Sequence, residues 1–370
     1  MLFEIEDTYF NCDIDNGNVI NIKSYNKKYN VTYNTENINT ILNNVYTEND
    51  FIIIDKNVYH LYNYLYSNFL QLAKVDTKNY YLFDAIEENK SISSVLAIVD
   101  ILYNLKFTKK NKIIVIGGGI TQDVCGFACA IYKRGIKWTY LPTTLLSMTD
   151  SCIGSKVNIN YNTKNLLGFF MAPDQIIISD TFIKTLHHHD IVSGLSEAMK
   201  ISLIGGKNCY DLFIQNMNTN NHFIEIIKLS LNIKKAIIEY DELEKNERKA
   251  LNYGHTFGHA IEITSNYVIP HGIAVLYGMI MINELFYNDK YCDINKYMYH
   301  LVPDKFKNMK LSYTTFIDCI LNDKKNDGDN ICFILLEDIG KIKFTYRKLE
   351  DINEILKLLF DKYFGEGIKE

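Results

Sequence analysis

The sequence predicts an α/β protein of two domains, with a parallel β-sheet in the N-terminal half and a mainly α-helical C-terminal half. Three observations support this prediction. The chain has 370 residues, more than a single hydrophobic core usually serves. Short apolar runs alternate with helical patterns in the first half, which is typical of a parallel sheet. Strand patterns nearly vanish after that. We therefore expect one domain over residues 1–185 and a second over residues 186–370.

Residues 1–50 contain short β-type runs separated by Asn-rich turns, and we interpret them as an extension of the sheet. Within them, Asp15, Asn16 and Gly17 suit the turn of a hairpin. Strand–helix units follow. The expected strands are residues 51–55, 81–84, 112–116, 137–141 and 176–178, and the expected helices are residues 58–69 and 94–105, with a third that starts near Asp123.

The C-terminal half shows helical periodicity over residues 191–204, 223–240, 250–265 and 273–287. A hairpin of residues 331–335 and 341–346 around Gly340 is the exception. Three consecutive histidines, residues 187–189, fall at the domain boundary. Adjacent side chains diverge and chelate an ion poorly, so we interpret these histidines as a solvated turn.

The composition narrows the class of protein. The sequence is 47% hydrophobic and 22% charged with a net charge of -5, which indicates a soluble globular protein and gives no reason to expect nucleic acid or a membrane as a partner. The N-terminus lacks a signal-peptide pattern, and no apolar run approaches the ~20 residues of a transmembrane helix. The eight cysteines form no CxxC pair, which favours reduced thiols. We expect a cytoplasmic protein.

Three of the nine histidines lie between positions 255 and 271. His255 and His259 are four residues apart, so on a helix both imidazoles share one face, as two ligands of one metal ion must. His271 can complete the set from the next helix. Gly254 and Gly258 flank the pair although glycine costs a helix ~1 kcal/mol relative to alanine, which indicates close approach of backbone or ligand. Spacing alone leaves open which histidines are ligands and which acid joins them, and histidines at this spacing also occur in cores and on surfaces.

Gly117, Gly118 and Gly119 follow an apolar strand and precede a helix. Such a loop lets the backbone approach a pyrophosphate at a helix N-terminus, and it is equally compatible with a plain tight turn. Glu197 and Lys200 are three residues apart on an expected helix, where a surface ion pair is the alternative to a functional pair. Solvated charge is the corresponding alternative for Lys234, Arg248, Lys324 and Lys325.

Ordered motifs run through the middle of the chain. They are residues 117–123, 133–135, 142–146, 150–156, 164–168, 193–200, 241–242 with Arg248, 251–259 and 271–272. In order and spacing these motifs resemble the 3-dehydroquinate synthase family of sugar phosphate cyclases, strongly from Gly117 to Met279 and more weakly outside that stretch. The resemblance implies an N-terminal Rossmann-like domain that binds NAD, a helical C-terminal domain that binds zinc or alternatively cobalt, and an active site in the cleft between them.

The resemblance also implies roles for single residues. The metal ligands are Glu197, His255 and His271, and His259 acts on the substrate as a proton-transfer or phosphate-contacting group. Arg134 reaches into the site of a neighbouring subunit, which implies a homodimer. The NAD contacts are Asp55, Glu87, Lys90, Gly117, Gly118, Gly119, Asp123, Thr143, Thr144, Lys164, Phe182 and Thr185. The substrate contacts are Asp150, Lys156, Asn165, Lys200, Lys234, Arg248, Asn252, His259 and one of Lys324 and Lys325.

The implied reaction is that of a carbon–oxygen lyase that converts 3-deoxy-arabino-heptulosonate 7-phosphate to 3-dehydroquinate and phosphate. A substrate alcohol is oxidised transiently by NAD, phosphate leaves by β-elimination, hydride returns, and an intramolecular aldol step closes the ring. Lys234 and Arg248 are the cations that such enzymes place against the substrate carboxylate, which an arginine matches with two parallel N–H donors. The alternatives are a sibling cyclase for another heptulose or hexose phosphate and a metal-dependent alcohol dehydrogenase.

Four departures from the family pattern concern the substrate. Gln122 stands where these synthases usually have glycine, and Ser155 replaces the second glycine of a Gly-Gly-Lys sequence. Ile273 replaces a glutamate, and the loop of residues 158–163 is one residue shorter. These departures leave the reaction type intact and bear on which sugar phosphate is used.

Overall fold

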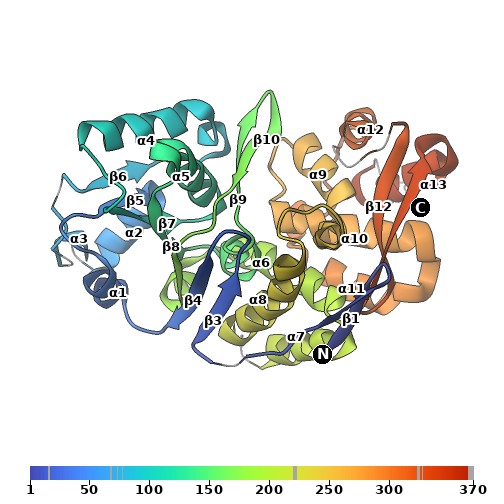
Figure 1. Ribbon diagram of the computed structural model, residues 1–370. Helices are drawn as coiled ribbons and strands as arrows, with labels where there is room; N and C mark the ends of the chain where they lie inside the picture. The colour runs from blue at the N-terminus through green and yellow to red at the C-terminus, as the bar shows by residue number, and fades with distance from the viewer. Residues whose placement is uncertain are drawn as a thin grey trace. The chain divides into compact units, whose positions relative to one another are not determined.

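The computed structural model describes residues 1–15, 17–66, 69–72, 74–76, 78–219, 223–322, 326 and 328–365. The chain forms two compact units, which can be followed along the chain in Figure 1. The sheet unit comprises Asp15–Leu186 and Phe223–Leu243, and the helical unit comprises Met1–Ile14, His187–His222 and Glu244–Glu370. This division differs from the expected domains in two segments, because residues 1–14 group with the helical unit and residues 223–243 with the sheet unit.

A seven-stranded sheet forms the core of the sheet unit in the described part of the chain. Its strands, in spatial order, are β3 (Val19–Lys23), β4 (Lys28–Asn34), β11 (Gln175–Ser179), β8 (Lys137–Pro142), β7 (Lys112–Gly117), β5 (Phe51–Asp55) and β6 (Tyr80–Phe83). All neighbours pair parallel except β3 with β4. Ile52, Ile53 and Ile54 of β5 are buried, as the continuous apolar strands of a parallel sheet covered by helices are. The predicted parallel sheet is confirmed.

The helices of this unit are α1 (Ile38–Val45), α2 (Lys56–Tyr66), α3 (Phe69–Leu72), α4 (Ile92–Asn104), α5 (Gly119–Ile131) and α8 (Phe223–Tyr240). At the start of α4 the Ser91 hydroxyl accepts a hydrogen bond from Ser94 N at 3.3 Å, which caps the helix. α4 and α5 lie side by side (Figure 1). The expected helix of residues 58–69 is present as α2 up to Tyr66, Phe69 lies in α3, and residues 67–68 lie outside the described part of the chain.

A hairpin of β9 (Lys156–Tyr161) and β10 (Thr163–Phe170) was not expected, and the interpretation of residues 158–163 as a loop is wrong. Asn162 makes the turn with a positive φ of 58°, a conformation that asparagine tolerates. The hairpin predicted at Asp15–Gly17, of which Asn16 lies outside the described residues, is also wrong, because the strands on either side, β2 (Thr8–Asn11) and β3, belong to different sheets. The turn instead joins β3 and β4, where Ser24 N donates to Lys27 O at 2.8 Å.

The helical unit contains a four-stranded sheet in spatial order β12 (Asn330–Asp338), β13 (Lys341–Lys348), β1 (Leu2–Ile5) and β2. The predicted late hairpin is confirmed as β12 and β13. β1 pairs parallel with β13, which explains why the N-terminal residues group with this unit. The helices are α6 (His188–Ile204), α7 (Lys207–Asn218), α9 (His255–Thr264), α10 (His271–Tyr287), α11 (Cys292–Leu301), α12 (Tyr313–Leu321) and α13 (Leu349–Phe364). The predicted mainly helical character is confirmed.

Two local predictions in this unit need correction. The three consecutive histidines do not form a separate turn, because α6 begins directly after His187 and includes His188 and His189. The expected helix of residues 250–265 is divided into a 3₁₀ segment (Glu247–Asn252) and α9. Gly254 separates the two with a φ of +81°, which no α-helix accommodates.

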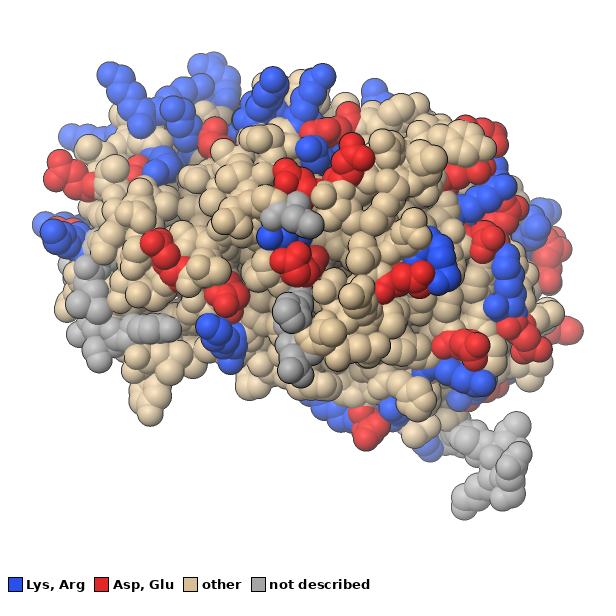
Figure 2. Space-filling model, turned by 90° about the horizontal axis from the view of Figure 1, so that it is seen from below, with Lys and Arg blue, Asp and Glu red and all other residues tan. Residues whose placement is uncertain are grey.

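Surface and redox features follow the composition. All eight cysteines are free thiols, as predicted. Among the described helices, none is both long enough and apolar enough to cross a membrane. On the face shown in Figure 2, acidic and basic side chains are interspersed over much of the surface.

Candidate active site

A carboxylate and two imidazoles converge in the helical unit. Glu197 lies on α6, His255 is the first residue of α9, and His271 is the first residue of α10. Glu197 Oε1 is 3.8 Å from His255 Nε2 and 3.5 Å from His271 Nε2. Glu197 and His255 are buried. Two imidazoles and a carboxylate form a donor set that Zn²⁺ takes in catalytic sites, where the fourth position is left to water or substrate.

The second nitrogen of each imidazole contacts an oxygen of the same unit. His255 Nδ1 is 3.2 Å from Tyr253 O, and His271 Nδ1 is 3.1 Å from Glu262 Oε2. Metal-binding histidines commonly use such a carbonyl or carboxylate contact to fix the tautomer and the ring orientation. Both rings are thereby oriented with Nε2 toward Glu197.

His259 adjoins the same cluster. Its ring centroid is 5.2 Å from that of His255 and 5.6 Å from that of His271, and each of the three histidines has a ring nitrogen within 4.8 Å of the others. The assignment of Glu197, His255 and His271 as ligands, with His259 left to the substrate, stays a prediction.

Glycines allow α9 and α10 to approach closely enough to bring the histidines together. A Cβ atom at Gly258 would lie 3.0 Å from Val275 Cα, and one at Gly278 would lie 2.0 Å from Gly254 O. The glycines beside His255 and His259 therefore serve a close backbone approach, as expected from their cost to the helix.

Two cations of the helical unit are buried. Lys200 donates a hydrogen bond from Nζ to Glu197 Oε2, and both side chains are almost fully buried, so a surface ion pair is excluded. Arg248 is also buried, in the 3₁₀ segment before α9. Asn252, which ends this segment, donates from Nδ2 to Glu244 Oε1 at 2.8 Å.

The glycine loop lies in the sheet unit, where β7 ends and α5 begins. Gly118 is the N-cap of α5 and supplies no side-chain cap, so the first N–H groups of the helix are left to another acceptor. A Cβ at Gly117 would lie 2.4 Å from Thr121 Oγ1, and one at Gly118 would lie 2.9 Å from Thr144 Cγ2. Thr121 Oγ1 is buried without a hydrogen-bond partner in the described residues. Thr143 N donates to Gly117 O at 3.0 Å. Thr143 and Thr144 therefore both adjoin the loop.

A partly buried polar network joins the segment before α4 to α5 and the β9–β10 hairpin. Lys90 Nζ lies 2.6 Å from Asp123 Oδ2 and 2.6 Å from Asn165 Oδ1. Asn160 links the network further, because it donates to Glu87 Oε1 at 2.8 Å and accepts from Asn165 N at 2.9 Å. Burial raises the pKa of Asp123, and the charge of Lys90 opposes that shift. The structure thus brings together four residues expected from the sequence: Glu87, Lys90, Asp123 and Asn165.

Asp150 and Lys234 form another ion pair in the sheet unit. Lys234 Nζ of α8 is 2.6 Å from Asp150 Oδ1 and also 2.5 Å from the Asp150 carbonyl oxygen. Asp150 lies on a one-turn π-helix, η3 (Ser147–Ser151). Lys156 follows shortly after as the first residue of β9.

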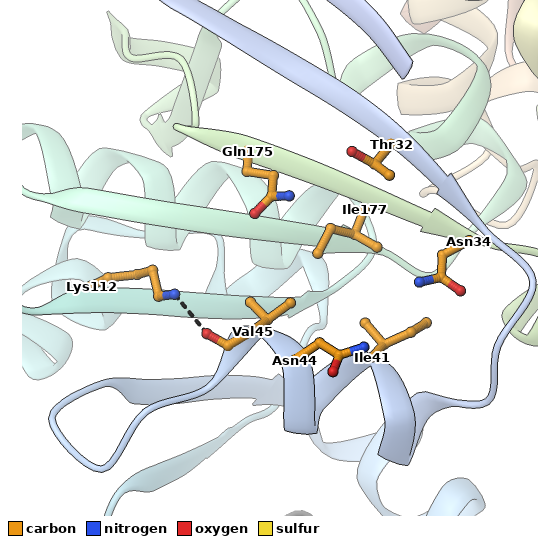
Figure 3. Close-up of a pocket in the computed structure, with 8 residues that line it drawn as sticks. All are labelled: Thr32, Asn34, Ile41, Asn44, Val45, Lys112, Gln175 and Ile177. Carbon is orange, nitrogen blue, oxygen red and sulfur yellow. Dashed lines mark hydrogen bonds between the residues drawn. The ribbon is translucent and has the colours of Figure 1, made fainter. Parts of the chain in front are cut away.

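A cavity of about 260 Å³ in the same unit lies elsewhere (Figure 3). It is lined by Thr32, Asn34, Ile41, Asn44, Val45, Lys112, Gln175 and Ile177. Lys112 is the first residue of β7 and donates to Val45 O at 2.7 Å, whereas the glycine loop follows the last residue of that strand. The cavity and the glycine loop therefore lie at opposite ends of β7.

Comparisons with known proteins show the family of this chain. The chain matches the family description "3-dehydroquinate synthase N-terminal" over residues 80–193 and "3-dehydroquinate synthase C-terminal" over residues 194–326. It is 35% identical over 324 residues to a 3-dehydroquinate synthase of Clostridium tetani, covering 84% of each chain. It is 36% identical over 320 residues to one of Pelagibacter ubique, covering 80% of this chain and 86% of the relative. This chain belongs to the 3-dehydroquinate synthase family.

Solved structures show the same fold. A 2-deoxy-scyllo-inosose synthase complexed with carbaglucose-6-phosphate, NAD⁺ and Co²⁺ matches with a TM-score of 0.79 and 22% identity over 92% of this chain and 99% of its own. A 2-epi-5-epi-valiolone synthase from Streptomyces hygroscopicus, with NAD⁺ and Zn²⁺ bound, matches with a TM-score of 0.75 and 20% identity over 90% of this chain and 97% of its own. This chain thus shares its fold with these two synthases.

The other described residues expected from the family pattern lie on several elements. Asp55 ends β5 and accepts from Asn57 N at 2.8 Å, and burial raises its pKa. Phe182 is buried with its ring centroid 5.2 Å from that of Tyr62, and Thr185 Oγ1 is 3.3 Å from Tyr62 Oη. Lys164 lies on β10, and Arg134 is exposed at the end of a 3₁₀ turn (Tyr132–Arg134). Lys324 and Lys325 lie outside the described residues.

The departures from the family pattern have local partners. Gln122 is hydrogen-bonded to Ser151, and Ser155, which has a φ of +64°, donates from its hydroxyl to Glu242 Oε1. A positive φ suits glycine, so the serine stands in a glycine conformation. Ile273 is buried in α10.

Sequence reasoning missed the roles of Glu262, Glu242 and Asn160. Glu262 had a signal, because it is three residues after His259 and seven after His255 and so shares their helix face. Glu242 accepts from Ser24 Oγ at 2.7 Å as well as from Ser155, a contact between segments too far apart in the chain for spacing to reveal.

Proposed function

We propose that this chain catalyses the 3-dehydroquinate synthase reaction, with 3-deoxy-arabino-heptulosonate 7-phosphate as its substrate and 3-dehydroquinate and phosphate as its products. The observation that carries the proposal is the convergence of Glu197, His255 and His271 in a chain 35% identical to a curated 3-dehydroquinate synthase over most of its length. This activity requires a metal site and a dinucleotide site. Glu197, His255 and His271 form the first, and the glycine loop of residues 117–119 forms part of the second.

The residues present fit NAD and a divalent metal. Glu197, His255 and His271 offer Zn²⁺ or Co²⁺ a carboxylate and two imidazole nitrogens. The contacts of the two Nδ1 atoms with Tyr253 O and Glu262 Oε2 fix the orientation of the imidazoles. The loop before α5 offers N–H groups to a pyrophosphate, and the buried Thr121 hydroxyl would gain a partner there. When bound, the metal would polarise a substrate hydroxyl and NAD would accept and return its hydride.

Side chains of this protein act on the substrate directly in this proposal. His259, which lies beside His255 and His271, exchanges a proton with the substrate hydroxyl. Lys156 and Asn165 bind the phosphate group. Arg248 and Lys234 bind the substrate carboxylate, because a guanidinium matches both of its oxygens and a charge-assisted pair is stronger than a neutral hydrogen bond.

A sibling cyclase for another sugar phosphate is the second candidate, favoured by Gln122 and Ser155. Phosphate release from one sugar phosphate at a time, with NAD and Zn²⁺ present, separates the two. We expect release from 3-deoxy-arabino-heptulosonate 7-phosphate, and we expect Arg248→Ala to lower kcat/KM by about 100-fold or more, because loss of one partner of a buried ion pair costs ~3–5 kcal/mol. Release from sedoheptulose 7-phosphate or glucose 6-phosphate, with none from the acid, would assign the chain to the sibling cyclases.

We further propose a homodimer in which Arg134 serves the partner's site. Arg134→Ala and His271→Ala subunits would each be inactive alone. Mixed dimers would regain activity, because one of their two sites has an intact metal cluster and receives Arg134 from the other subunit. No recovery on mixing, or the mass of a monomer by light scattering, would contradict this proposal.

We also propose that the protein acts in the cytoplasm, where its cysteines remain reduced. Cell fractionation with antibody detection tests this, and recovery with secreted or membrane material would contradict it.

A further inference from the structure

Gln122 forms two hydrogen bonds with one residue of a distant segment. Its Nε2 donates to Ser151 O at 2.7 Å, and Ser151 Oγ donates to its Oε1 at 2.7 Å. The Gln122 side chain is buried, with 3% of its surface exposed. Both polar atoms of the amide are thus used in a fixed direction, which a buried amide requires.

The partner segment is the one-turn π-helix η3, which ends at Ser151. The last carbonyls of any helix lack N–H donors within that helix, and a single π-turn is an uncommon conformation. Cys152 N closes the turn on Ser147 O at 3.0 Å. The amide of Gln122 donates to the carbonyl of Ser151, the last residue of η3, and so caps the π-turn from another segment.

The backbone of Gln122 is hydrogen-bonded to the glycine loop. Its backbone N donates to Gly118 O at 3.0 Å, which is the first helical hydrogen bond of α5. A Cβ at Gly119 would lie 3.9 Å from Ser151 Oγ, so the loop and the end of η3 are neighbours. The side chain of Gln122 therefore links the first turn of α5, which follows the glycine loop, to the end of η3.

The residue that η3 carries is Asp150, whose carboxylate and carbonyl both hold Lys234 Nζ. Displacement of η3 would displace both oxygens and the ammonium group with them. A glycine at position 122 would supply no group to the Ser151 carbonyl. The amide of Gln122 is linked to Asp150 through the adjacent residue, Ser151.

We propose that Gln122 is a positioning residue, which holds Asp150 and Lys234 at a fixed place relative to the glycine loop and so sets the recognition of the substrate by this pair. The proposal rests on the proposed function for the identity of the substrate. It adds a role for a residue that is neither an expected metal ligand nor an expected substrate contact. This residue affects kcat/KM for the sugar phosphate and does not affect the affinity for NAD or metal.

The test compares Gln122→Met, Gln122→Glu and Ser151→Ala with the wild type, all loaded with NAD and Zn²⁺. Gln122→Met keeps the volume and removes both hydrogen bonds. We expect kcat/KM to fall by on the order of 10- to 100-fold, the effect of a small misplacement of groups that position a substrate. The dissociation constant of NAD and the zinc content should change less than threefold. Ser151→Ala removes one bond of the two and should give a smaller loss.

Gln122→Glu supplies a readout that a merely structural role would not move. The introduced carboxylate still accepts from Ser151 Oγ, but it faces the Ser151 carbonyl without a proton to donate. Protonation restores the donor, so the kcat/KM of this variant relative to wild type should rise as the pH falls. A flat ratio, an unchanged kcat/KM in Gln122→Met, or an equal loss of NAD affinity would overturn the proposal.

Hydrogen exchange separates this proposal from the proposed function. Amides of residues 147–152 should exchange faster in Gln122→Met than in wild type, whether or not the wild type releases phosphate. Faster exchange with an inactive wild type would contradict the proposed function alone. Unchanged exchange would contradict the capping role of Gln122 even if the wild type is active.

Discussion

At the scale of single residues, Glu262 is the side chain on which the metal-type cluster depends without being one of its expected ligands. Its Oε2 lies 3.1 Å from His271 Nδ1. Loss of such an outer partner typically weakens metal affinity 10- to 100-fold. We expect this of Glu262→Gln, measured by zinc titration against a chelator. Asp211→Asn, at an exposed acid on α7, should leave the affinity unchanged.

Retained metal in Glu197→Gln and His271→Ala, with loss in His259→Ala, would show that the ligand assignment is wrong.

Ser155 combines a conformational cost with a hydrogen bond. Its φ of +64° costs a residue with a Cβ about 1 kcal/mol, and its hydroxyl donates to the buried Glu242. Ser155→Ala and Ser155→Gly lose the same bond, and only glycine relieves the backbone. We therefore expect the alanine variant to unfold with about 1 kcal/mol less free energy than the glycine variant in denaturant titrations. Equal stabilities would show that the backbone at this position carries no strain.

The candidate site was predictable residue by residue only in part. The spacing of His255, His259 and His271 indicated a cluster, which the structure contains. Glu197 was placed in it by family resemblance, because its segment is far from the histidines in sequence. Gln122 and Ser151 were beyond prediction for the same reason, since no spacing rule relates an α-helix to a π-turn almost thirty residues later.

At the scale of elements, the packing of α9 on α10 decides the geometry of the cluster, because each helix begins with one of its histidines. Gly278→Ala tests this. Helix propensity alone predicts a gain of ~1 kcal/mol, but the new methyl group would lie 2.0 Å from Gly254 O. We expect a net loss of ~1–3 kcal/mol in unfolding free energy and weaker zinc binding. Gly119→Ala, where the nearest atom is 3.9 Å away, is the matched control and should not lose stability. An unfolding free energy in Gly278→Ala at or above that of wild type would contradict this packing argument.

The elements with continuous apolar runs were predictable, and those that depend on distant partners were not. β5 and β7 are buried β-branched strands that any periodicity analysis finds. β9 was missed because Asn158 and Asn160 disfavour strands, and their cost is offset by contacts with other segments. Asn158 N donates to Asp123 Oδ1 at 3.1 Å and Asn160 donates to Glu87.

At the scale of the whole molecule, composition and pattern predicted two parts of different character, and the structure contains both. The first segment of the sheet unit ends at Leu186, and a second segment, Phe223–Leu243, also belongs to that unit. Two segments cross the expected boundary near residue 185 because long-range pairing outweighs chain order. β1 joins the sheet of β13 at the far end of the sequence, and Lys234 of α8 pairs with Asp150. Local sequence patterns carry no information on either pairing.

The central claim is that this chain uses NAD as a catalyst in a reaction that releases phosphate. The most direct test incubates the Zn²⁺-loaded protein with substoichiometric NAD and excess 3-deoxy-arabino-heptulosonate 7-phosphate, and follows phosphate and NADH absorbance together. We predict many phosphates released per NAD with the absorbance nearly flat, because the same hydride is removed and returned. NADH accumulating in proportion to product, with the phosphate ester intact, would contradict the claim and identify a dehydrogenase.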